Sequence, residues 1–422
     1  MVFDPPRPPR LVVRTREIDP DLDILGFADP RSPLAWLRRG DGIIGVGAPV
    51  AEYVADAAAR LAGASPSAAW REITATADVD DPVGLPGTGL VAFGAFAFDD
   101  RSASTSRLIV PQAIVGRHEG RAWITRISTA EIPESEVEPL PYGSYWPATL
   151  GPGTVDPAGY QAIVRAGLDA ISAGEVGKVV LARDLVGTIP SDADVRRLVR
   201  SLAESYPDTW TFSVDGLVGA SPETLVTVSG GVVTARVLAG TFPRGTDAGG
   251  DAEASVALSH SAKDLDEHRY AIQSVLDSLA PHTTELRADD EPFALELPNL
   301  WHLATDVAGE LADHASALDL VAELHPTAAV AGTPTDAAIE VIRRLEPFDR
   351  GRYAGPVGWV DGDGNGEWAI ALRCAQIGAG TPGTETIPVV AHAGAGIVAG
   401  SDPETELLET RVKFRPIVDA LA

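Results

Sequence analysis

Strand-like runs follow one another closely in this chain, and their spacing limits the folds that it can adopt. Apolar runs typical of strands occupy residues 42–46, 89–98, 108–115, 122–127, 178–183, 209–214, 224–228, 232–238, 357–360, 368–377 and 389–398. Helical periodicity covers residues 50–62, 157–173, 193–205, 263–279, 318–324, 335–345 and the segment that begins near residue 403. Parallel pairing needs a crossover helix between strands, and many of these runs lack one. The pattern therefore predicts an α/β (α+β) fold with large mixed, mostly antiparallel sheets and flanking helices.

The chain offers one candidate boundary, the proline- and glycine-rich stretch at residues 131–153. We therefore divide it into an N-terminal part, residues 1–150, and a second part, residues 151–422. Neither an internal repeat nor a long low-complexity linker separates them, which favours one compact structural unit. Residues 1–40 are rich in proline and arginine and indicate no clear element.

Net charge and cysteine content narrow the class of protein. The charge of −27 argues against a nucleic-acid partner, because binding a phosphate backbone needs a basic surface. The single cysteine, Cys374, excludes an intramolecular disulfide and a cysteine-based zinc site. The start of the chain lacks the apolar core of a signal peptide, and no apolar run could span a membrane. We expect a cytoplasmic protein without membrane contact, in which any anionic substrate is neutralised locally.

Lysine is nearly absent from this chain. Only Lys178, Lys263 and Lys413 occur, so 30 of the 33 basic residues are arginine. A lysine can give up its proton in a protein whereas an arginine cannot, so a retained lysine is a candidate base. Lys178 heads an apolar run whose pattern predicts burial, which favours a function. For Lys263 and Lys413, drift in composition explains their presence equally well.

Carboxylates recur at helical spacing beside two of these lysines. Glu267 lies four residues after Lys263, and Glu406, Glu409 and Lys413 share one face of the last helix. Two helices that each offer an inward glutamate would form an oxygen-rich site suited to Mg²⁺. Ordinary ion pairs on solvated helix faces explain the same spacing.

Glu223 stands at a Ser-Pro turn immediately before an apolar strand. A carboxyl group in this position can be partly desolvated, which raises its pKa and suits a general acid. A solvated turn residue is the alternative.

Alternation over residues 367–374 places Arg373 on the same strand face as Glu367 and two small alanines. The space beside the alanines makes Arg373 a candidate clamp for a carboxylate, and a structural pair with a glutamate is the alternative. The glycines of residues 394–396 and 238–241 lack the spacing of a dinucleotide site and favour close backbone approach to a ligand. His302 and His325 are interpreted as hydrogen-bonded structural residues.

Ten motifs in order carry a resemblance to a known family. They are Lys178-Val-Val-Leu-Ala-Arg, Ser221-Pro-Glu, Leu238-Ala-Gly-Thr with Pro243-Arg-Gly, Lys263-Asp-x-x-Glu-His, Trp301-His-Leu-Ala-Thr, Leu324-His-Pro-Thr, Tyr353-Ala-Gly-Pro-Val-Gly, Ala371-Leu-Arg, Gly394-Ala-Gly-Ile-Val and Glu406-x-x-Glu-Thr-x-x-Lys. This set resembles the chorismate-utilising enzymes of menaquinone, siderophore and tryptophan biosynthesis. The resemblance implies that residues 151–422 form the chorismate-binding catalytic region and that residues 1–150 complete the same fold. Ala328 and Ala331 depart from the family's usual proline and glycine.

The resemblance also implies which nucleophile is used. Ammonia users in the family carry a glutamine-type residue where Lys178 stands, or an Asp-Leu-x-Arg-Asn-Asp run after the Glu-His pair. Neither is found here, which favours water over ammonia and leaves no role for a glutaminase subunit. The segments at Trp301 and Arg373 look more like isochorismate synthases than salicylate synthases.

In that family the residue roles are expected as follows. Glu267 and Glu409, with Glu406 acting through water, would hold Mg²⁺; Lys178 would act as the base and Glu223 as the acid. The expected substrate-binding residues are Gly240, Thr241, His325, Thr327, Tyr353, Arg373, Gly394, Ala395, Gly396 and Lys413. Chorismate is the only partner expected, and the protein is expected to be a monomer. A salicylate synthase and a noncatalytic, acidic divalent-metal-binding protein stay open as alternatives.

Overall fold

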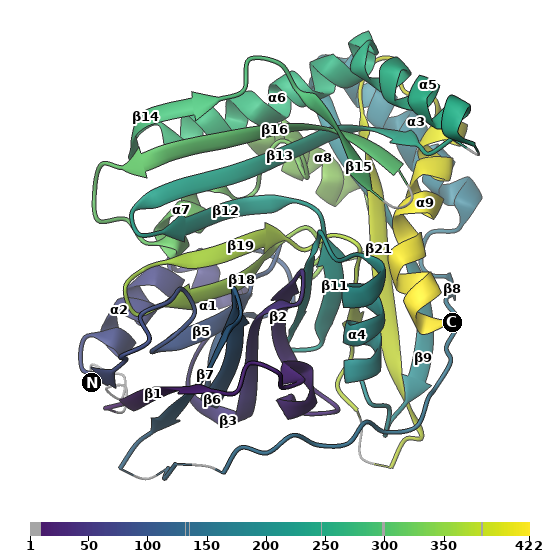
Figure 1. The fold of residues 1–422 in the computed structure, drawn as a ribbon. Helices are drawn as coiled ribbons and strands as arrows, with labels where there is room; N and C mark the ends of the chain where they lie inside the picture. The colour runs from purple at the N-terminus through teal and green to yellow at the C-terminus, as the bar shows by residue number, and fades with distance from the viewer. Residues whose placement is uncertain (1–9, 131, 135, 246, 298–299, 381–382) are drawn as a thin grey trace, which may run out of the picture.

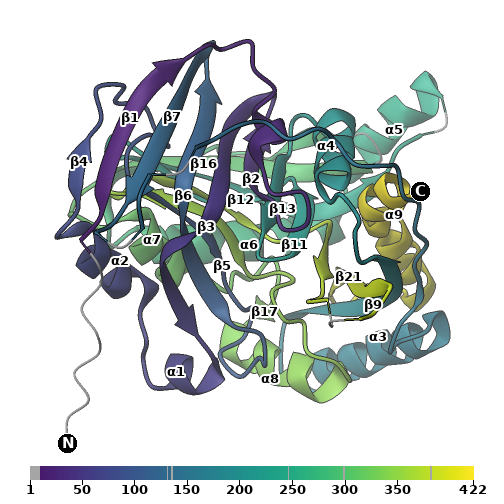
Figure 2. The same cartoon turned by 90° about the horizontal axis from the view of Figure 1, so that it is seen from below.

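The computed structural model describes residues 10–130, 132–134, 136–245, 247–297, 300–380 and 383–422. Its strands form one connected network in which nearly all ladders are antiparallel, the pairing of β1 with β4 being parallel. Helices flank this network on its outer faces (Figures 1 and 2). The predicted mixed, mostly antiparallel architecture is confirmed.

The N-terminal part is mainly strands. It contains β1 (Val12–Ile18), η1 (Ile24–Phe27), β2 (Leu34–Arg38), β3 (Asp41–Ala55), α1 (Ala57–Leu61), α2 (Pro66–Thr74), β4 (Asp78–Asp80), β5 (Val91–Ala95), β6 (Ser106–His118) and β7 (Arg121–Ser128). Two of these strands pair with strands of the second part, β2 with β10 and β5 with β18. The two parts of the chain therefore share their sheets.

The second part alternates strands and helices. It contains β8 (Gly151–Pro152), α3 (Pro157–Ser172), β9 (Lys178–Pro190), α4 (Arg196–Ser205), β10 (Trp210–Val214), β11 (Leu217–Ser221), β12 (Thr224–Ser229), β13 (Val232–Pro243), α5 (Ala248–Ser259), α6 (Ala262–Leu279), β14 (Thr283–Ala288), β15 (Phe293–Leu297), β16 (Leu300–Leu311), α7 (Ala317–Leu324), β17 (Gly332–Thr333), α8 (Thr335–Leu345), β18 (Pro356–Asp361), β19 (Gly366–Ile370), β20 (Cys374–Ile377), β21 (Thr386–Ile397) and α9 (Pro403–Leu421).

The ladders extend from β6 in two arms. The first arm continues through β3, β2, β10, β11, β20 and β21 to β9. The second continues through β5, β18, β19, β12 and β13 to β16. Figure 1 shows α6 over β13 and β16 of the second arm and α9 along β21 of the first. Buried apolar side chains fill the space between these strands and helices.

The helices that carry candidate site residues begin at well-formed caps. The hydroxyl of Ser261 accepts a hydrogen bond from the backbone of Asp264 at the start of α6. The carboxylate of Asp402 accepts one from Thr405 at the start of α9, where Pro403 occupies the first turn. Such caps satisfy backbone N–H groups that have no partner within a helix and so fix where each helix begins.

Two predicted elements are wrong in part. The helix predicted at residues 50–62 is mostly strand, because β3 continues to Ala55 in pairing with β6 and leaves only residues 57–61 to α1. The strand predicted at residues 368–377 is interrupted between Ile370 and Cys374, where Arg373 adopts a left-handed φ of 49°. Residues 1–40, for which the sequence indicated no element, contain β1, η1 and β2.

Candidate active site

A small cavity lies between the two arms of the sheet network. Its walls come from both arms, from α6 and α9, and from the loops around residues 222, 329 and 350. The lining residues are Val180, Pro222, Glu223, Leu238, Ala239, Gly240, Glu267, His302, Ala329, Val330, Arg350, Tyr353, Ala354, Leu372, Arg373, Gly394, Gly396 and Lys413. Its volume is about 50 Å³.

Lys178, at the first position of β9, is completely buried beside this cavity. Its Nζ lies 3.1 Å from Oε1 of Glu267 on α6, which is an ion pair by distance without a well-directed hydrogen bond. A Cβ on Gly396 would approach the same Glu267 oxygen to 2.3 Å and Cε of Lys178 to 3.1 Å. Glycine at residue 396 therefore makes room for the pair. The prediction that Lys178 is buried is confirmed.

Glu223 occupies the turn between β11 and β12 and is 6% exposed. Burial raises its pKa to about 7, although Lys178, Arg373 and Lys413 act in the opposite direction. Near neutral pH this carboxyl group thus exists in both the protonated and the ionised form, as a general acid requires. The alternative of a solvated turn residue does not hold.

Arg373 lies between β19 and β20 and is buried, and its guanidinium contacts a histidine. Its guanidinium donates to Nε2 of His302 at 3.2 Å, and Nδ1 of His302 lies 3.1 Å from the carbonyl oxygen of Gly240. Burial and the nearby Arg373 lower the pKa of His302 well below its usual range. The neutral ring can therefore donate to Gly240 and accept from Arg373 at once. His302 is hydrogen-bonded at both ring nitrogens, as expected, and it also lines the cavity.

Lys413 and Glu409 form an ion pair on α9 at the edge of the cavity. Nζ of Lys413 also donates to the carbonyl oxygen of Gly394 at 2.9 Å. Glu406 is 1% exposed and lies near Tyr160, whose pKa is raised mainly by burial and further by the Glu406 and Glu409 charges. Within the described part of the chain, no three carboxylate, histidine or cysteine side chains gather closely enough to hold a metal ion.

Other predicted site residues fall into three groups. Gly240, Tyr353, Gly394 and Gly396 line the cavity as expected. His325, Thr327 and Ala395 are buried or half-buried but do not line it, and His325 instead contacts the carbonyl oxygen of Phe98 at 3.1 Å. The side chains of Thr241 and Lys263 lie outside the described part of the structure. Substrate contacts by these residues stay predictions.

Several cavity residues were not identified from the sequence. They are Val180, Pro222, Leu238, Ala239, Ala329, Val330, Arg350, Ala354 and Leu372. Most are apolar, and an apolar side chain in a strand or loop gives no sign of whether it faces a core or a cavity. Arg350 gave a weak signal, its spacing of four residues from Glu346, which is also typical of a solvated pair.

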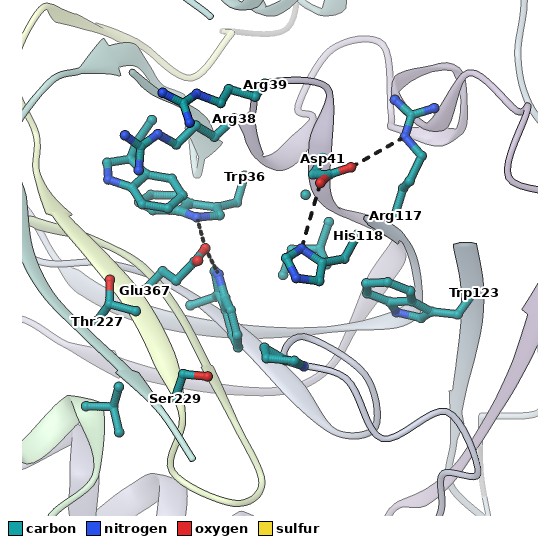
Figure 3. A pocket seen from close by; sticks show the side chains of 16 residues that line it. Trp36, Arg38, Arg39, Asp41, Arg117, His118, Trp123, Thr227, Ser229 and Glu367 are labelled. Carbon is teal, nitrogen blue, oxygen red and sulfur yellow. Dashed lines mark hydrogen bonds and ion pairs between the residues drawn. The ribbon is translucent and has the colours of Figure 1, made fainter. Parts of the chain in front are cut away.

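Glu367 does not share a surface with Arg373, contrary to the alternation predicted for residues 367–374. Its carboxylate accepts hydrogen bonds from the indoles of Trp36 at 2.8 Å and Trp359 at 3.1 Å. Figure 3 shows Glu367 pointing toward Trp36 in a separate cavity of about 290 Å³ beside β2 and β3. The break between β19 and β20 explains this, because the alternation ends where the strand ends.

Comparisons with known proteins identify the family of this chain. Residues 144–422 match the family described as "Chorismate binding enzyme". Isochorismate synthase DhbC of Bacillus subtilis is 41% identical over 63% of this chain and 68% of its own length. A putative isochorismate synthase MenF of Mycobacterium tuberculosis is 37% identical over 79% of this chain and 87% of its own.

Solved structures are similar over nearly the whole chain. The structure of a putative 2,3-dihydroxybenzoate-specific isochorismate synthase from Bacillus anthracis covers 94% of this chain and 98% of its own length, with 31% identity and a TM-score of 0.74. MenF of Escherichia coli covers 98% of this chain and 95% of its own length with a TM-score of 0.78, and at 24% identity it supports the fold alone. The family match covers well over half of the sequence. This chain belongs to the chorismate-binding enzyme family.

Proposed function

We propose that this chain is an isochorismate synthase, an isomerase that converts chorismate to isochorismate. One observation carries the proposal: a buried carboxyl group with a pKa of about 7 lines a cavity together with the cations Arg350, Arg373 and Lys413, and the buried Lys178 lies beside this cavity, paired with its lining residue Glu267. A lysine base and a protonated carboxylic acid are the pair needed to add water at one ring carbon and expel a hydroxyl from another. The curated relatives named isochorismate synthases support the same activity.

Lys178 and Glu223 divide the proton transfers between them. The neutral amine of Lys178 takes a proton from the water whose oxygen bonds to C2 of chorismate. The ring double bonds shift, the bond from C4 to its hydroxyl breaks, and Glu223 donates the proton with which that hydroxyl leaves as water. One water is consumed and one is released, so no redox cofactor takes part.

Arg373 and Lys413 would bind the carboxylates of chorismate. Both side chains line the cavity, and Arg373 is already oriented by His302. The strand β21 contributes the backbone of residues 394–396, whose glycines allow close approach of a ligand. These groups neutralise the substrate locally in a chain with a net charge of −27.

Glu267 and Glu409 fit a role as ligands of Mg²⁺, with Glu406 nearby on the same helix as Glu409. The carboxylates are hard oxygen donors at the cavity edge, and each is now paired with a lysine, Glu267 with Lys178 and Glu409 with Lys413. Mg²⁺ takes only one or two protein carboxylates together with water and substrate oxygens, so a closed cluster of three is not required. When bound, the ion would neutralise a substrate carboxylate.

The identity of the product formed from chorismate distinguishes this function from the two alternatives. Purified protein is incubated with chorismate and Mg²⁺, and the products are separated and identified by mass. Isochorismate without pyruvate supports the proposal, whereas salicylate with pyruvate indicates a salicylate synthase. Unchanged chorismate would leave the noncatalytic metal-binding protein as the better assignment.

Compartment and partners are part of the same proposal. We place the protein in the cytoplasm as a monomer without a glutaminase subunit. The single cysteine, Cys374, is buried and unpaired, which is compatible with a reducing compartment. No helix in the described ranges is long and apolar enough to cross a membrane.

A further inference from the structure

One edge of β9 is covered by three different structures in turn. At the start of the strand, β17 pairs with residues 178 and 179, and the backbone N–H of Val180 donates to Ala331 at 2.9 Å. Farther along, Gly153 donates to Asp184, and β8 pairs with residues 185 and 186. Between these two regions the carbonyl oxygen of Val180 and the N–H of Ala182 face side chains instead of a strand.

Those side chains belong to Glu346 and Arg350. The backbone N–H of Ala182 donates to Oε1 of Glu346 at 2.7 Å, and the guanidinium of Arg350 donates to the carbonyl oxygen of Val180 at 2.7 Å. Arg350 also donates to both oxygens of Glu346, at 2.6 and 2.8 Å. A bidentate ion pair thus replaces the missing strand partner at this point of the edge.

The same guanidinium also bonds the segment at Val330, which runs beside β9. It donates to the carbonyl oxygen of Val330 at 3.0 Å, while Val330, Val180 and Arg350 itself line the cavity. Its charge lies 4.5 Å from the ring centre of Phe98. With side-chain exposures of 3% for Arg350 and 1% for Glu346, the pair is removed from solvent and rigidly bonded.

Lys178 lies two residues before Val180, so both side chains project from the same face of β9. Fixing the carbonyl oxygen of Val180 therefore fixes the strand face from which the proposed base projects. We propose that the Glu346–Arg350 ion pair is a positioning element, which sets the distance between the strand that carries Lys178 and the cavity wall at Val330. A displacement of about 1 Å at a reacting group can cost roughly 100-fold in rate.

Arg350→Lys tests this proposal. A lysine keeps the positive charge but cannot reach Val180, Val330 and both Glu346 oxygens together, because it lacks the planar fork of arginine. The matched control is Arg196→Lys. Arg196 is likewise buried in an ion pair, with Asp194, and bonds to backbone carbonyls of Gly26, Leu140 and Pro141, none of which lines the cavity.

Hydrogen exchange gives a readout that does not depend on activity. In the full-length Arg350→Lys protein, amide exchange in a peptide covering residues 179–183 should be at least about tenfold faster than in wild type. Peptides from β13 should not change, and Arg196→Lys should leave residues 179–183 as in wild type. Unchanged exchange at residues 179–183 in Arg350→Lys would overturn the proposal.

Kinetics test the catalytic consequence, which rests on the proposed function. At a temperature where both variants are folded, Arg350→Lys should lower kcat by roughly 10- to 100-fold with the KM for chorismate within about threefold of wild type. A raised KM with unchanged kcat would make Arg350 a substrate contact, and an equal loss of kcat in Arg196→Lys would indicate general destabilisation. Either result would contradict a positioning role.

A second variant covers the case in which Arg350→Lys does not fold. Glu346→Asp keeps the charge, but its side chain is one methylene shorter and cannot reach Arg350 and the Ala182 N–H together. It should show the same local exchange and the same loss of kcat. If the wild-type protein made no isochorismate, the proposed function would fail, and the exchange measurement would still decide the positioning role.

Discussion

Nζ of Lys178 lies 3.1 Å from Oε1 of Glu267, so the proposed base and a proposed metal ligand are in direct contact. The two residues come from different elements, β9 and α6, and are 89 positions apart in the sequence. The lysine is completely buried, and an uncompensated charge at this depth would be unfavourable. A change at either residue therefore affects the other. The variants Lys178→Gln and Glu267→Gln test the two roles one at a time.

Lys178→Gln should lose turnover while the fold is kept. Glutamine is no larger than lysine and can remain next to Glu267, but it cannot accept a proton from water near neutral pH. We expect a loss of about 10²- to 10⁴-fold in kcat, the usual scale for a general base, with chorismate binding retained. Kinetics, binding calorimetry and circular dichroism check this. Turnover like that of wild type would remove Lys178 from the mechanism.

Glu223→Gln should lower kcat by about 10²- to 10⁴-fold and leave chorismate binding largely unchanged. In wild type the acid form is required, so kcat/KM should fall as pH rises through about 7, the pKa of Glu223 in the protein without substrate. The residual activity of Glu223→Gln should lack this decline. Weaker binding with unchanged turnover would instead identify Glu223 as a substrate contact.

The same pKa makes a prediction for stability. The folded-state pKa of Glu223 is raised from 4.5 to about 7, so the native protein binds more protons than the unfolded chain between these pH values. The contribution is fully present below about pH 4.5 and is lost as pH rises toward 7. Denaturant unfolding should therefore show wild type losing up to about 3 kcal/mol more than Glu223→Gln from pH 4.5 to 7. Parallel pH dependence in the two proteins would contradict the raised pKa.

Chelation tests the carboxylates of α6 and α9. EDTA should abolish activity and added Mg²⁺ should restore it, because the proposed ligands are all oxygen atoms. Glu267→Gln should raise the Mg²⁺ concentration needed for half-maximal activity more than it changes the melting temperature. A fully active metal-free preparation would disprove the site built on Glu267 and Glu409.

His302→Leu should raise the KM for chorismate by about tenfold, since it removes the acceptor that orients Arg373 and leaves buried donors and acceptors unpaired. His302→Gln is the matched control. Its amide can donate to Gly240 and accept from Arg373, so binding should be largely restored. Steady-state kinetics of both variants decide the point, and equal KM values in the two would remove His302 from substrate binding.

Ammonium salts should give no aminated product even at high pH. The sequence around Lys178 and after His268 lacks the features of the ammonia users in the family. Incubation with chorismate, Mg²⁺ and ammonium, followed by mass analysis, checks this. Detection of anthranilate or aminodeoxychorismate would reverse the assignment of water as the nucleophile.

Much of the site could be predicted, because the secondary structure and burial of these residues follow from their neighbours in the sequence. An apolar strand that begins with one of only three lysines predicted the buried Lys178. A Ser-Pro turn before a strand offered a desolvated Glu223 as one of two interpretations, and the structure decides for it. Helical periodicity placed Glu267 and Glu409 on the helices that the structure shows as α6 and α9. These features depend on residues close together in the chain, where propensity and periodicity act.

The remaining features of the site depend on contacts between residues that are far apart in the sequence. Arg373 faces the cavity because β19 ends at Ile370 and a left-handed residue redirects the chain, whereas strand alternation placed it beside Glu367. Glu346 and Arg350 have the spacing of a solvated pair. They are nevertheless buried, because they form hydrogen bonds with backbone groups of β9 that have no strand partner. The sequence determined which chemical groups the protein possesses and on which elements they lie. Only the tertiary structure decided which groups meet, because burial and backbone hydrogen bonding are set by contacts between distant segments.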